Sequence, residues 1–253
     1  MNITGSRVIK LDSIPSTNDF AEQLLSISKQ PEGTIVLAEY QTAGKGQGQN
    51  QWLSEKGKNI LMSVILYPVF LTAEKQFFLN AAMTLAVFNA IRKFIPSGIK
   101  TNIKWPNDIY AGNKKIAGIL IKNSLAGDKI KYTVAGTGIN INQKSFSPCL
   151  NATSLALISG KENDKESVLQ ELLKQLDVFY RHLKENNMSL LQENYNAHLL
   201  WLGEYREFGL ADGSRIEGAI TGVSTEGKLL IKTGQTVNSY RHGEVVLLSK
   251  NNE

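Results

Sequence analysis

The chain has 253 residues, 42% of them hydrophobic and 20% charged, with a formal net charge of +5. This composition is typical of a protein that buries a full core, and it excludes global disorder. No apolar stretch reaches the ~20 residues of a membrane-spanning helix, and the N-terminus lacks the apolar segment of a secretory signal. We therefore predict a cytoplasmic protein without membrane contact. The single cysteine, Cys149, cannot form an internal disulfide, and the three scattered histidines argue against a structural zinc site.

The N-terminal part of the chain predicts two strands, one helix and a long loop. Residues 8–14 alternate weakly in polarity and end at a proline, which predicts a strand. Side-chain oxygens at 16–19 then offer a cap for a helix that runs to about Lys29. A β-branched run at 34–40 predicts the second strand, whereas residues 41–58 are rich in Gly, Gln, Asn and Lys. Loops of that length inside a compact domain are usually functional or disordered, so this one is a candidate site.

The central part predicts a buried strand, a long core helix and an antiparallel sheet. Residues 59–67 read as a buried strand, and residues 73–95 carry apolar side chains at helical spacing. Gly112-Asn113 is a tight-turn pair between two further strands. The remaining elements are strands at 100–104, 108–111, 115–122 and 129–139 and helices at 154–159, 165–184 and 189–200. We therefore predict an α+β fold with a mixed, mostly antiparallel sheet packed with helices.

The character of the sequence changes from Tyr205 onward, where short strands follow one another closely. Glycine-containing turn signals join them, which predicts a small SH3-like β-barrel. We place the boundary near Gly203, so that a larger domain covers 1–203 and the barrel covers 204–253. The predicted strands of the barrel are 205–210, 215–223, 228–233, 236–241 and 244–249.

The positive charge is concentrated between residues 98 and 122. This segment holds five lysines against one acidic residue, Asp108. Such a run of lysines usually forms a solvated surface. The more specific alternative is that it binds an anionic ligand, such as a phosphate, a carboxylate or a nucleic acid. The lysines are Lys100, Lys104, Lys114, Lys115 and Lys122.

The loop at 43–52 has three glycines at alternate positions, Gly44, Gly46 and Gly48. Glycine lets backbone N–H groups converge on an anion without a Cβ clash, so the loop is a candidate phosphate cradle. It matches neither the Walker-type loop nor the dinucleotide fingerprint, because position 49 is Gln. From the residues alone, a flexible linker and an anion site are equal alternatives.

A second candidate site is the turn Lys104-Trp105-Pro106-Asn107-Asp108, which combines a cation, an amide and a carboxylate around a rigid proline. The turn at Gly112-Asn113 folds Lys115 back beside Asn107 and Asp108, so that one pocket can hold two lysines, an amide and a carboxylate. The ordinary alternatives are a strand-end turn with Trp105 in the core and a lysine at the solvent edge of a strand.

Together these segments resemble the bacterial biotin–protein ligases over nearly the whole chain. The resemblance implies a catalytic domain of the class II aminoacyl-tRNA-synthetase-like, biotin–lipoate ligase type, followed by the small barrel. It also implies a short form without an N-terminal DNA-binding domain, because the first catalytic strand begins by about Val8. The matching segments, in family order, are Ser16-Thr17-Asn18, 39–46, Trp52, 104–108, 115–120 and 136–140.

The resemblance implies two-step chemistry with biotin and ATP as substrates, Mg²⁺ as cofactor and no tightly bound prosthetic group. Biotin first reacts with ATP to give biotinyl-5′-AMP and pyrophosphate. A lysine of a biotin carboxyl carrier protein, the biotin-bearing domain of a carboxylase such as acetyl-CoA carboxylase, then accepts the biotin. Members include monomers and dimers, so a homodimer stays open, and no DNA partner is expected.

The resemblance also assigns roles to individual residues. Lys115 would bridge the biotin carboxylate and the α-phosphate, Trp52 would stack on adenine and Asn140 would read its edge. Lys45, Asn107, Asp108 and Lys115 are the implied catalytic residues, with Asp108 supporting Mg²⁺. The implied biotin-binding residues are Ser16, Thr17, Asn18, Gln41, Gly44, Lys45, Lys115 and Gly118. The implied ATP- and adenylate-binding residues are Lys45, Gly46, Gln47, Trp52, Lys104, Asn107, Lys115 and Asn140.

The loop departs from the common family pattern, in which arginines alternate with the glycines. Here Lys45 is the only cation between Gly44 and Asn50, so retention of the adenylate would depend more on backbone N–H groups. Two alternative functions remain. Lipoate– or octanoate–protein ligases share the catalytic architecture, and a nucleic-acid-binding module would suit the sequence pI of about 9.1.

Overall fold

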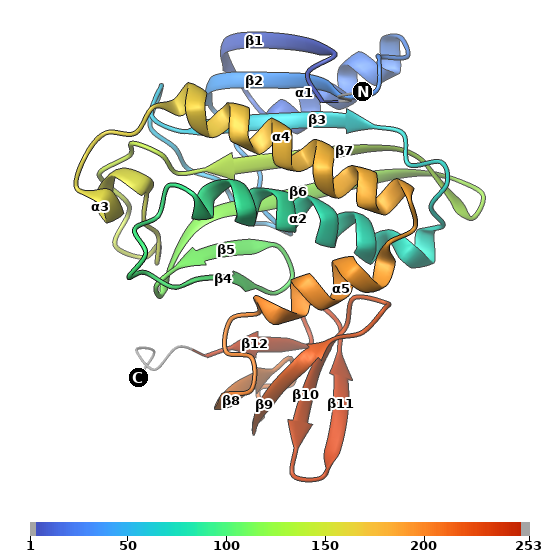
Figure 1. Cartoon of the computed structure of the whole chain (residues 1–253), viewed down its shortest axis with the longest axis vertical. Helices are drawn as coiled ribbons and strands as arrows, with labels where there is room; N and C mark the ends of the chain where they lie inside the picture. Colours follow the sequence, from blue (N-terminus) through green and yellow to red (C-terminus); the bar gives the residue numbers. More distant parts are fainter. Residues whose placement is uncertain (1–3, 249–253) are drawn as a thin grey trace.

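The computed structural model describes residues 4–248 and shows two parts (Figure 1). The larger part is a seven-stranded sheet with helices on both faces, and the smaller part is a five-stranded sheet formed by the C-terminal strands. The predicted α+β class with a mostly antiparallel main sheet is confirmed. The outer ends of the two predicted domains, 1–203 and 204–253, and the last residue of the predicted strand 244–249 lie outside the described residues. No helix within residues 4–248 is both long and apolar enough to cross a membrane.

The larger part follows the predicted order of elements with small shifts at their ends. The strand that begins at Lys114 continues to Ala126, four residues beyond the predicted end. The strands are β1 Arg7–Ile14, β2 Thr34–Gln41, β3 Ile60–Leu66, β4 Thr101–Lys104, β5 Asp108–Ala111, β6 Lys114–Ala126 and β7 Lys129–Ile139. The helices are α1 Thr17–Ile27, η1 Ala73–Lys75, α2 Gln76–Arg92, α3 Leu155–Ser159, α4 Lys165–Lys184 and α5 Met188–Ala197, where η1 is a short 3₁₀ turn.

The main sheet has the strand order β1-β2-β3-β7-β6-β5-β4. Only β1 and β2 run parallel, and every other neighbouring pair is antiparallel. In the register of β6 with β7, Gly118 lies opposite Gly138 and Leu120 lies opposite Gly136. Because glycines face each other at this point, the centre of the sheet carries a strip without side chains.

The two faces of the sheet are covered by different helices. On one face, α2 and α4 pack over residues such as Ile35 and Val64 (Figure 1). On the other face, Ala21 of α1 packs with Val36 and Ile65, which are the neighbours of the first pair along β2 and β3. Side chains of a strand alternate between faces, so a strand covered on both sides has all its side chains buried. This explains why β3 is buried along its whole length.

The C-terminal strands form an antiparallel sheet in the order β11-β10-β9-β8-β12. Within residues 205–248, β11 and β12 stand at opposite edges and are not paired along their lengths, so closure into the predicted SH3-like barrel is not seen there. The strands are β8 Tyr205–Leu210, β9 Arg215–Val223, β10 Leu229–Thr233, β11 Thr236–Tyr240 and β12 Val245–Leu247.

The C-terminal sheet is attached to the larger part at the turn between β4 and β5. The indole nitrogen of Trp105 donates a hydrogen bond of 3.0 Å to the carbonyl of Gly227. The carbonyl of Pro106 accepts hydrogen bonds from the side chains of Asn80 at 2.9 Å and Tyr195 at 2.7 Å. The Trp105 turn is therefore fixed by α2, by α5 and by the C-terminal sheet together.

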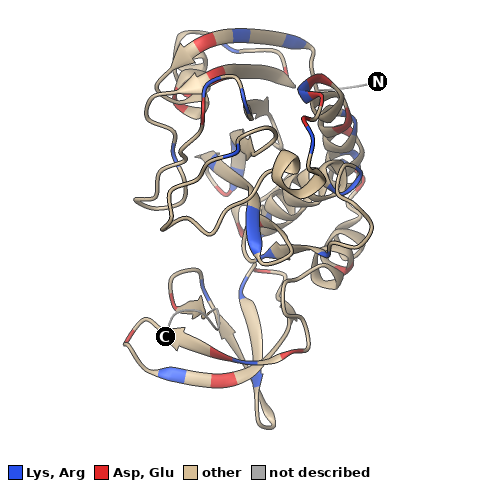
Figure 2. Ribbon diagram, turned by 90° about the vertical axis from the view of Figure 1, so that its left-hand side faces the viewer, with Lys and Arg blue, Asp and Glu red and all other residues tan. Residues whose placement is uncertain are grey.

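The basic run between residues 98 and 122 does not form one solvated face. Lys122 lies 2.7 Å from Glu22 and 3.2 Å from Asp19, which are both in α1, and Lys115 lies 2.7 Å from Asp108. Figure 2 shows basic and acidic residues interspersed over the ribbon. Folding therefore neutralises part of the run through residues that are distant in the sequence.

A carboxylate outside the basic run connects α4 to the sheet. Glu32 accepts hydrogen bonds from the backbone N–H of Tyr67 at 2.9 Å and from the Tyr180 hydroxyl at 2.7 Å, and its other oxygen lies 3.0 Å from the Lys184 ammonium. Burial alone would raise the pKa of the Glu32 carboxyl, but these partners outweigh burial and hold the pKa below its ordinary value of 4.5.

We predict that Glu32→Gln lowers the free energy of unfolding by about 1–3 kcal/mol at neutral pH, because hydrogen bonds to a charged acceptor are lost. A carboxyl whose pKa is lowered by folding stabilises the protein above its unfolded pKa and loses that contribution as the pH falls through its folded pKa. The difference between wild type and variant should therefore shrink below about pH 4.5. Urea unfolding across pH measures it, with the exposed Glu162→Gln as control, and a difference that does not change with pH would contradict the assignment.

Candidate active site

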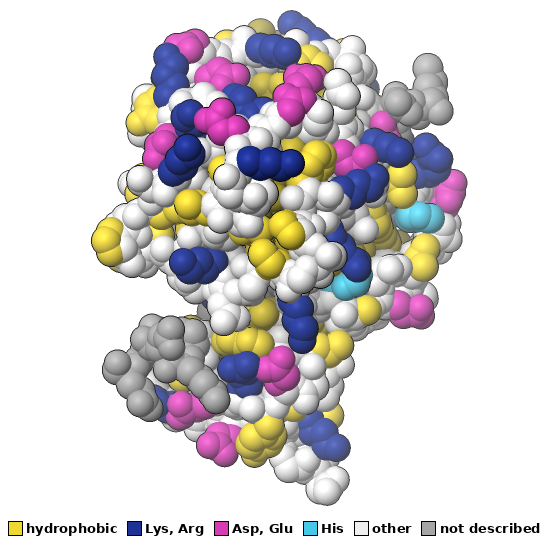
Figure 3. Space-filling model, turned by 60° about the vertical axis from the view of Figure 1, so that its left-hand side comes forward, with side chains coloured by type: hydrophobic (Ala, Val, Ile, Leu, Met, Phe, Trp, Pro, Cys, Tyr) yellow, Lys and Arg dark blue, Asp and Glu magenta, His cyan; other side chains and the backbone are white. Residues whose placement is uncertain are grey.

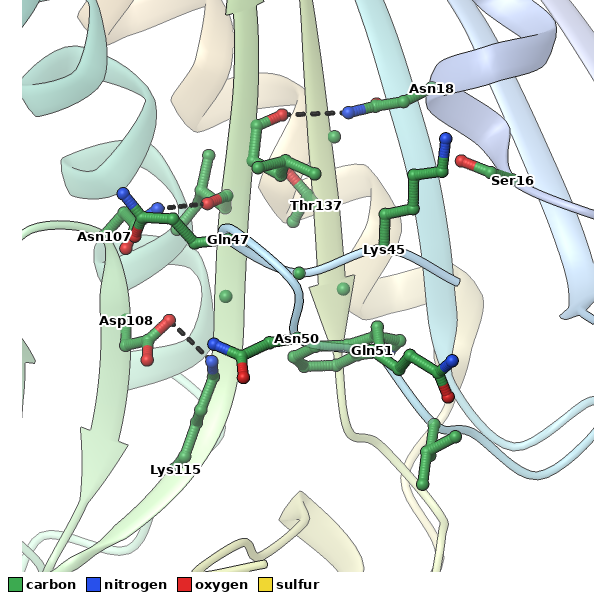
Figure 4. Close-up of a pocket in the computed structure, with 18 of the residues that line it drawn as sticks. Ser16, Asn18, Lys45, Gln47, Asn50, Gln51, Asn107, Asp108, Lys115 and Thr137 are labelled. Carbon is green, nitrogen blue, oxygen red and sulfur yellow. Dashed lines mark hydrogen bonds and ion pairs between the residues drawn. The ribbon is translucent and has the colours of Figure 1, made fainter. Parts of the chain in front are cut away.

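A cavity of about 580 Å³ lies on the face of the sheet that α1 covers only in part (Figure 4). Strands β6 and β7 form its floor, the N-terminus of α1 and the β4–β5 turn form its sides, and the glycine-rich loop after β2 crosses over it. His242 of the C-terminal sheet also lines it. The predicted site residues that line it are Ser16, Thr17, Asn18, Gln41, Lys45, Gly46, Gln47, Trp52, Lys104, Asn107, Asp108, Lys115 and Gly118.

One end of the cavity is a corner of neutral polar groups at the start of α1. Ser16 caps this helix, and its side chain accepts a long hydrogen bond of 3.4 Å from the N–H of Asp19. The side-chain oxygen of Gln41, at the end of β2, accepts from the backbone N–H of Thr17 at 2.7 Å and from its hydroxyl at 3.1 Å. Buried donors and acceptors at this end are thus held in fixed positions by one another.

Ser63 of β3 completes this corner from below. Its hydroxyl lies 2.6 Å from the side-chain oxygen of Asn18 and 2.8 Å from the hydroxyl of Thr17, and it is fully buried. The amide of Asn18 donates to the Leu120 carbonyl of β6 at 3.1 Å. Ser63 was not among the predicted site residues, although a lone hydroxyl inside an otherwise apolar buried strand is the signal that could have indicated it.

Glycines on the floor let the walls approach the backbone closely. A Cβ at position 136 would lie 2.4 Å from the side-chain oxygen of Asn18, and one at position 138 would lie 2.4 Å from the ring of Trp52. At position 118 it would lie 3.1 Å from both the Asp108 carboxylate and the Lys115 side chain. A side chain at 136 or 138 would therefore displace a wall of the cavity.

The opposite end of the cavity carries charge. The ammonium of Lys115 lies 2.7 Å from the carboxylate of Asp108 and 5.5 Å from the centre of the Trp52 ring. The Asn107 amide donates to the Ile119 carbonyl at 2.6 Å, which ties the turn to β6. Lys104 also lines the cavity, and its ammonium donates a hydrogen bond of 3.4 Å to the hydroxyl of Tyr110, which lines the smaller cavity beside it. The predicted meeting of Lys115 with the Asn107–Asp108 turn is present in the structure.

The glycine-rich loop is more ordered than its composition indicated. Gly44 accepts a hydrogen bond of 2.9 Å from the N–H of Trp52, and the N–H of Gly46 donates to the Asn50 carbonyl at 2.8 Å, so the loop is a narrow hairpin. Gly44 does not line the cavity, but a Cβ there would lie 2.4 Å from the Trp52 carbonyl. Lys45 points toward the α1 side of the cavity and away from Lys115, and its ammonium lies 2.7 Å from Asp19 (Figure 4).

Asn140 faces a second, smaller cavity of about 170 Å³, which shares Trp52 and Lys115 with the first. Its amide nitrogen donates to the Thr153 carbonyl at 3.0 Å. The buried side-chain oxygen of Asn140 and the indole nitrogen of Trp52 have no hydrogen-bond partner among the described residues. Buried polar atoms without partners are costly, so this small cavity offers unused hydrogen-bonding capacity to a ligand.

Comparison with known proteins agrees with this site. Residues 11–140, which supply most of the cavity, match the biotin/lipoate A/B protein ligase family. The chain belongs to that family.

Relatives at the sequence level include the bifunctional ligase/repressor BirA of Bacillus spizizenii, which is 34% identical over 97% of this chain and 75% of its own length. The biotin–[acetyl-CoA-carboxylase] ligase of Mycobacterium tuberculosis is 27% identical over 96% of this chain and 91% of its own. Among solved structures, the biotin protein ligase of Aquifex aeolicus in complex with biotin and ATP has a TM-score of 0.78 at 29% identity, covering 95% of this chain and 98% of that one.

We predict that Gly138→Ala displaces Trp52, because the added Cβ would overlap the indole ring. The tryptophan emission spectrum of the variant should shift relative to wild type, while its thermal unfolding stays cooperative. Gly98→Ala is the matched control, since a Cβ there has no neighbour within 4 Å. Identical spectra for Gly138→Ala and wild type would show that Trp52 does not rest on β7 in solution.

Proposed function

We propose that the protein activates biotin with ATP to form biotinyl-5′-AMP and pyrophosphate, and then transfers biotin to a lysine of a biotin carboxyl carrier protein, as in acetyl-CoA carboxylase. The observation that carries this proposal is the composition of the cavity, with a neutral polar corner at one end and the Lys115–Asp108 pair at the other. A substrate that carries an uncharged polar group at one end and a carboxylate at the other fits this order of groups. The names of the relatives support the same activity.

The polar corner suits the ureido ring of biotin. A ureido group has two N–H donors and one carbonyl acceptor and carries no charge, so it needs fixed neutral partners. Ser16, Thr17 and Gln41 provide hydroxyl, amide and backbone groups of this kind. Asn18 is bonded to Ser63 and Leu120, so we assign it the role of holding this corner in place. The glycine floor lets Asn18, Trp52 and the Lys115–Asp108 pair lie close to the backbone, so that they form the walls around the space for the ring and the aliphatic chain.

The charged end suits the reacting groups. A carboxylate oxygen of biotin attacks the α-phosphorus of ATP, the bond from that phosphorus to the bridging oxygen breaks, and pyrophosphate leaves. Negative charge builds up on the phosphoryl oxygens, so a preorganised cation lowers the barrier. Lys115 is such a cation, because Asp108 holds it over the floor before any substrate arrives. Lys104 supplies a second positive charge on the same side of the cavity.

A magnesium ion fits this end only as a partner of the nucleotide. No group of three acidic, histidine or cysteine side chains that could hold a metal exists within residues 4–248. Mg²⁺ in nucleotide sites commonly uses one or two carboxylates together with phosphate oxygens and water. Asp108 would supply the protein ligand, and the ion would neutralise phosphate charge.

The smaller cavity suits the adenine base. Trp52 offers an aromatic face, and the unpartnered oxygen of Asn140 offers an acceptor for the exocyclic amine of adenine. Both residues were assigned to adenine by resemblance, and their sharing of one cavity supports that assignment. Lys115 stands between this cavity and the larger one, where an α-phosphate between adenine and biotin would lie.

In the second step the ε-amine of the acceptor lysine attacks the acyl carbon, AMP leaves, an amide forms and the amine loses a proton. A groove of about 410 Å³, lined by residues of both parts, shares Gln47, Asn107 and His242 with the main cavity. Figure 3 shows the molecule narrowing between these two parts. We propose that the module after residue 203 supports the carrier step from this side, and that it steadies Trp105 through Gly227.

The neutral corner favours biotin over lipoate or octanoate. An alkyl or dithiolane end offers no hydrogen-bonding group to Ser16, Thr17 and Gln41 and would cover them without replacing water, so the corner discriminates against such substrates.

We predict that Lys115→Ala slows biotin-dependent release of pyrophosphate from ATP by roughly 10–150-fold, because a hydrogen bond to a charged group contributes about 1.5–3 kcal/mol in the transition state. Lys114→Ala, at the exposed neighbouring position, is the matched control and should keep the wild-type rate. Single-turnover pyrophosphate release measures the effect, and thermal unfolding verifies the fold. A wild-type rate for Lys115→Ala would exclude the assigned role.

A further inference from the structure

The tip of the glycine-rich loop, residues 45–51, crosses over the cavity with few attachments. Its backbone hydrogen bonds, from Gly46 to Asn50 at 2.8 Å and from Asn50 to Gln47 at 3.2 Å, are internal. A bridge between Lys45 and Gln51 closes the same hairpin. These bonds fix the shape of the loop tip but leave its position over the cavity undetermined.

One ion pair fixes that position. Among the described residues, the only hydrogen bond or ion pair that connects the loop tip to the rest of the chain is the contact of 2.7 Å between the Lys45 ammonium and the Asp19 carboxylate. Asp19 lies in the first turn of α1, directly after the polar corner, and its other oxygen is 3.2 Å from Lys122. Burial alone would raise the pKa of Asp19, but the two lysines outweigh it and lower that pKa, so the carboxylate is charged at neutral pH.

We propose that Asp19 is a positioning residue that holds the loop tip over the cavity through Lys45. The anchor is rigid because α1 is capped and packed, whereas the loop tip is not. With Lys45 held, the amides of Gln47 and Asn50 stand above the region of Asn107, Asp108 and Lys115 (Figure 4). Lys45, the sole cation of the loop tip, therefore acts through its partner on α1, and the Gln47 and Asn50 side chains that it places over the reaction centre are neutral.

An ordinary surface ion pair is the alternative explanation. The side chains of Lys45 and Asp19 are 49% and 38% exposed, and such pairs contribute little to global stability. Among the described residues, however, the loop tip has no other hydrogen bond or ion pair to the rest of the chain, so its opening equilibrium depends on this pair even when the melting temperature does not. We expect the loss of the pair to favour the open loop by about 2–5-fold.

The helix α1 contains a matched control. Glu22 lies one turn after Asp19, its side chain is also 38% exposed, and it pairs with Lys122 at 2.7 Å. Glu22 makes no contact with Lys45 among the described residues. A general effect of removing negative charge from this face of α1 would appear in Glu22→Gln as well as in Asp19→Asn, whereas an effect on the loop would appear in Asp19→Asn alone.

Chymotrypsin cleavage at Trp52 and Leu53 of the ligand-free protein tests the proposal. Asp19→Asn should be cleaved about 2–5-fold faster than wild type, Glu22→Gln should match wild type, and Asp19→Glu should restore most of the protection. Lys45→Gln should equal Asp19→Asn, and the double variant should be no faster than either single one. High salt should bring wild type toward the variants. Wild-type cleavage of Asp19→Asn, or effects that multiply in the double variant, would overturn the proposal.

The consequence for the reaction rests on the proposed function and has a separate readout. If the loop tip encloses biotin, Asp19→Asn should raise the biotin KM by about 2–5-fold with little change in kcat, and Asp19→Glu should reverse the rise. An unchanged KM would overturn the link to biotin. If the protein released no pyrophosphate with biotin, the proposed function would be contradicted. The role of Asp19 in holding the loop tip would not be, because the cleavage experiment needs neither biotin nor ATP.

Discussion

The site depends on the close approach of side chains to bare backbone at the centre of the sheet. Gly118 and Gly138 are paired across β6 and β7, and Gly136 lies one step further on the same face. The space that three Cβ atoms would fill is taken by Asn18, by Trp52 and by the Lys115–Asp108 pair. A helix terminus, a loop and a hairpin thus meet on one strip of backbone. The polar corner, the indole wall and the cation occupy fixed positions because that strip is bare.

The two ends of the cavity differ in how firmly they are built. The corner around Thr17 is buried, and its hydrogen bonds to Gln41 and Ser63 come from two different strands, so it is formed before a ligand arrives. The loop over the cavity is attached by a single, half-exposed ion pair and by the stacking of Trp52 on Gly138. A substrate can therefore bind to the preformed corner around Thr17 while the loop over the cavity still opens and closes.

Local sequence patterns predicted the helices and strands and the contact of Lys115 with Asp108, but not the contact of Lys45 with Asp19. The tight turn at Gly112-Asn113 folds β6 back along β5, so the approach of Lys115 to Asp108 could be predicted from their spacing. The register shift that places Gly118 opposite Asp108 could not. Contacts between distant segments could not be predicted in this way. The partner of Lys45 is on α1, and the partners of Lys122 are about a hundred positions away in the chain. Ser63 supports the polar corner, and His242 lines the cavity, only through the arrangement of whole sheets. Such contacts depend on strand register, which a single sequence does not specify.

The carboxylic acid that the protein selects in the first step tests the proposed biotin site directly. Pyrophosphate release from ATP and Mg²⁺ would be measured with biotin, with lipoate and with octanoate under identical conditions. We predict that release with biotin is at least about 100-fold faster than with either of the others, because only biotin offers hydrogen-bonding groups to Ser16, Thr17 and Gln41. Equal rates with the three acids, or release with lipoate or octanoate alone, would contradict it.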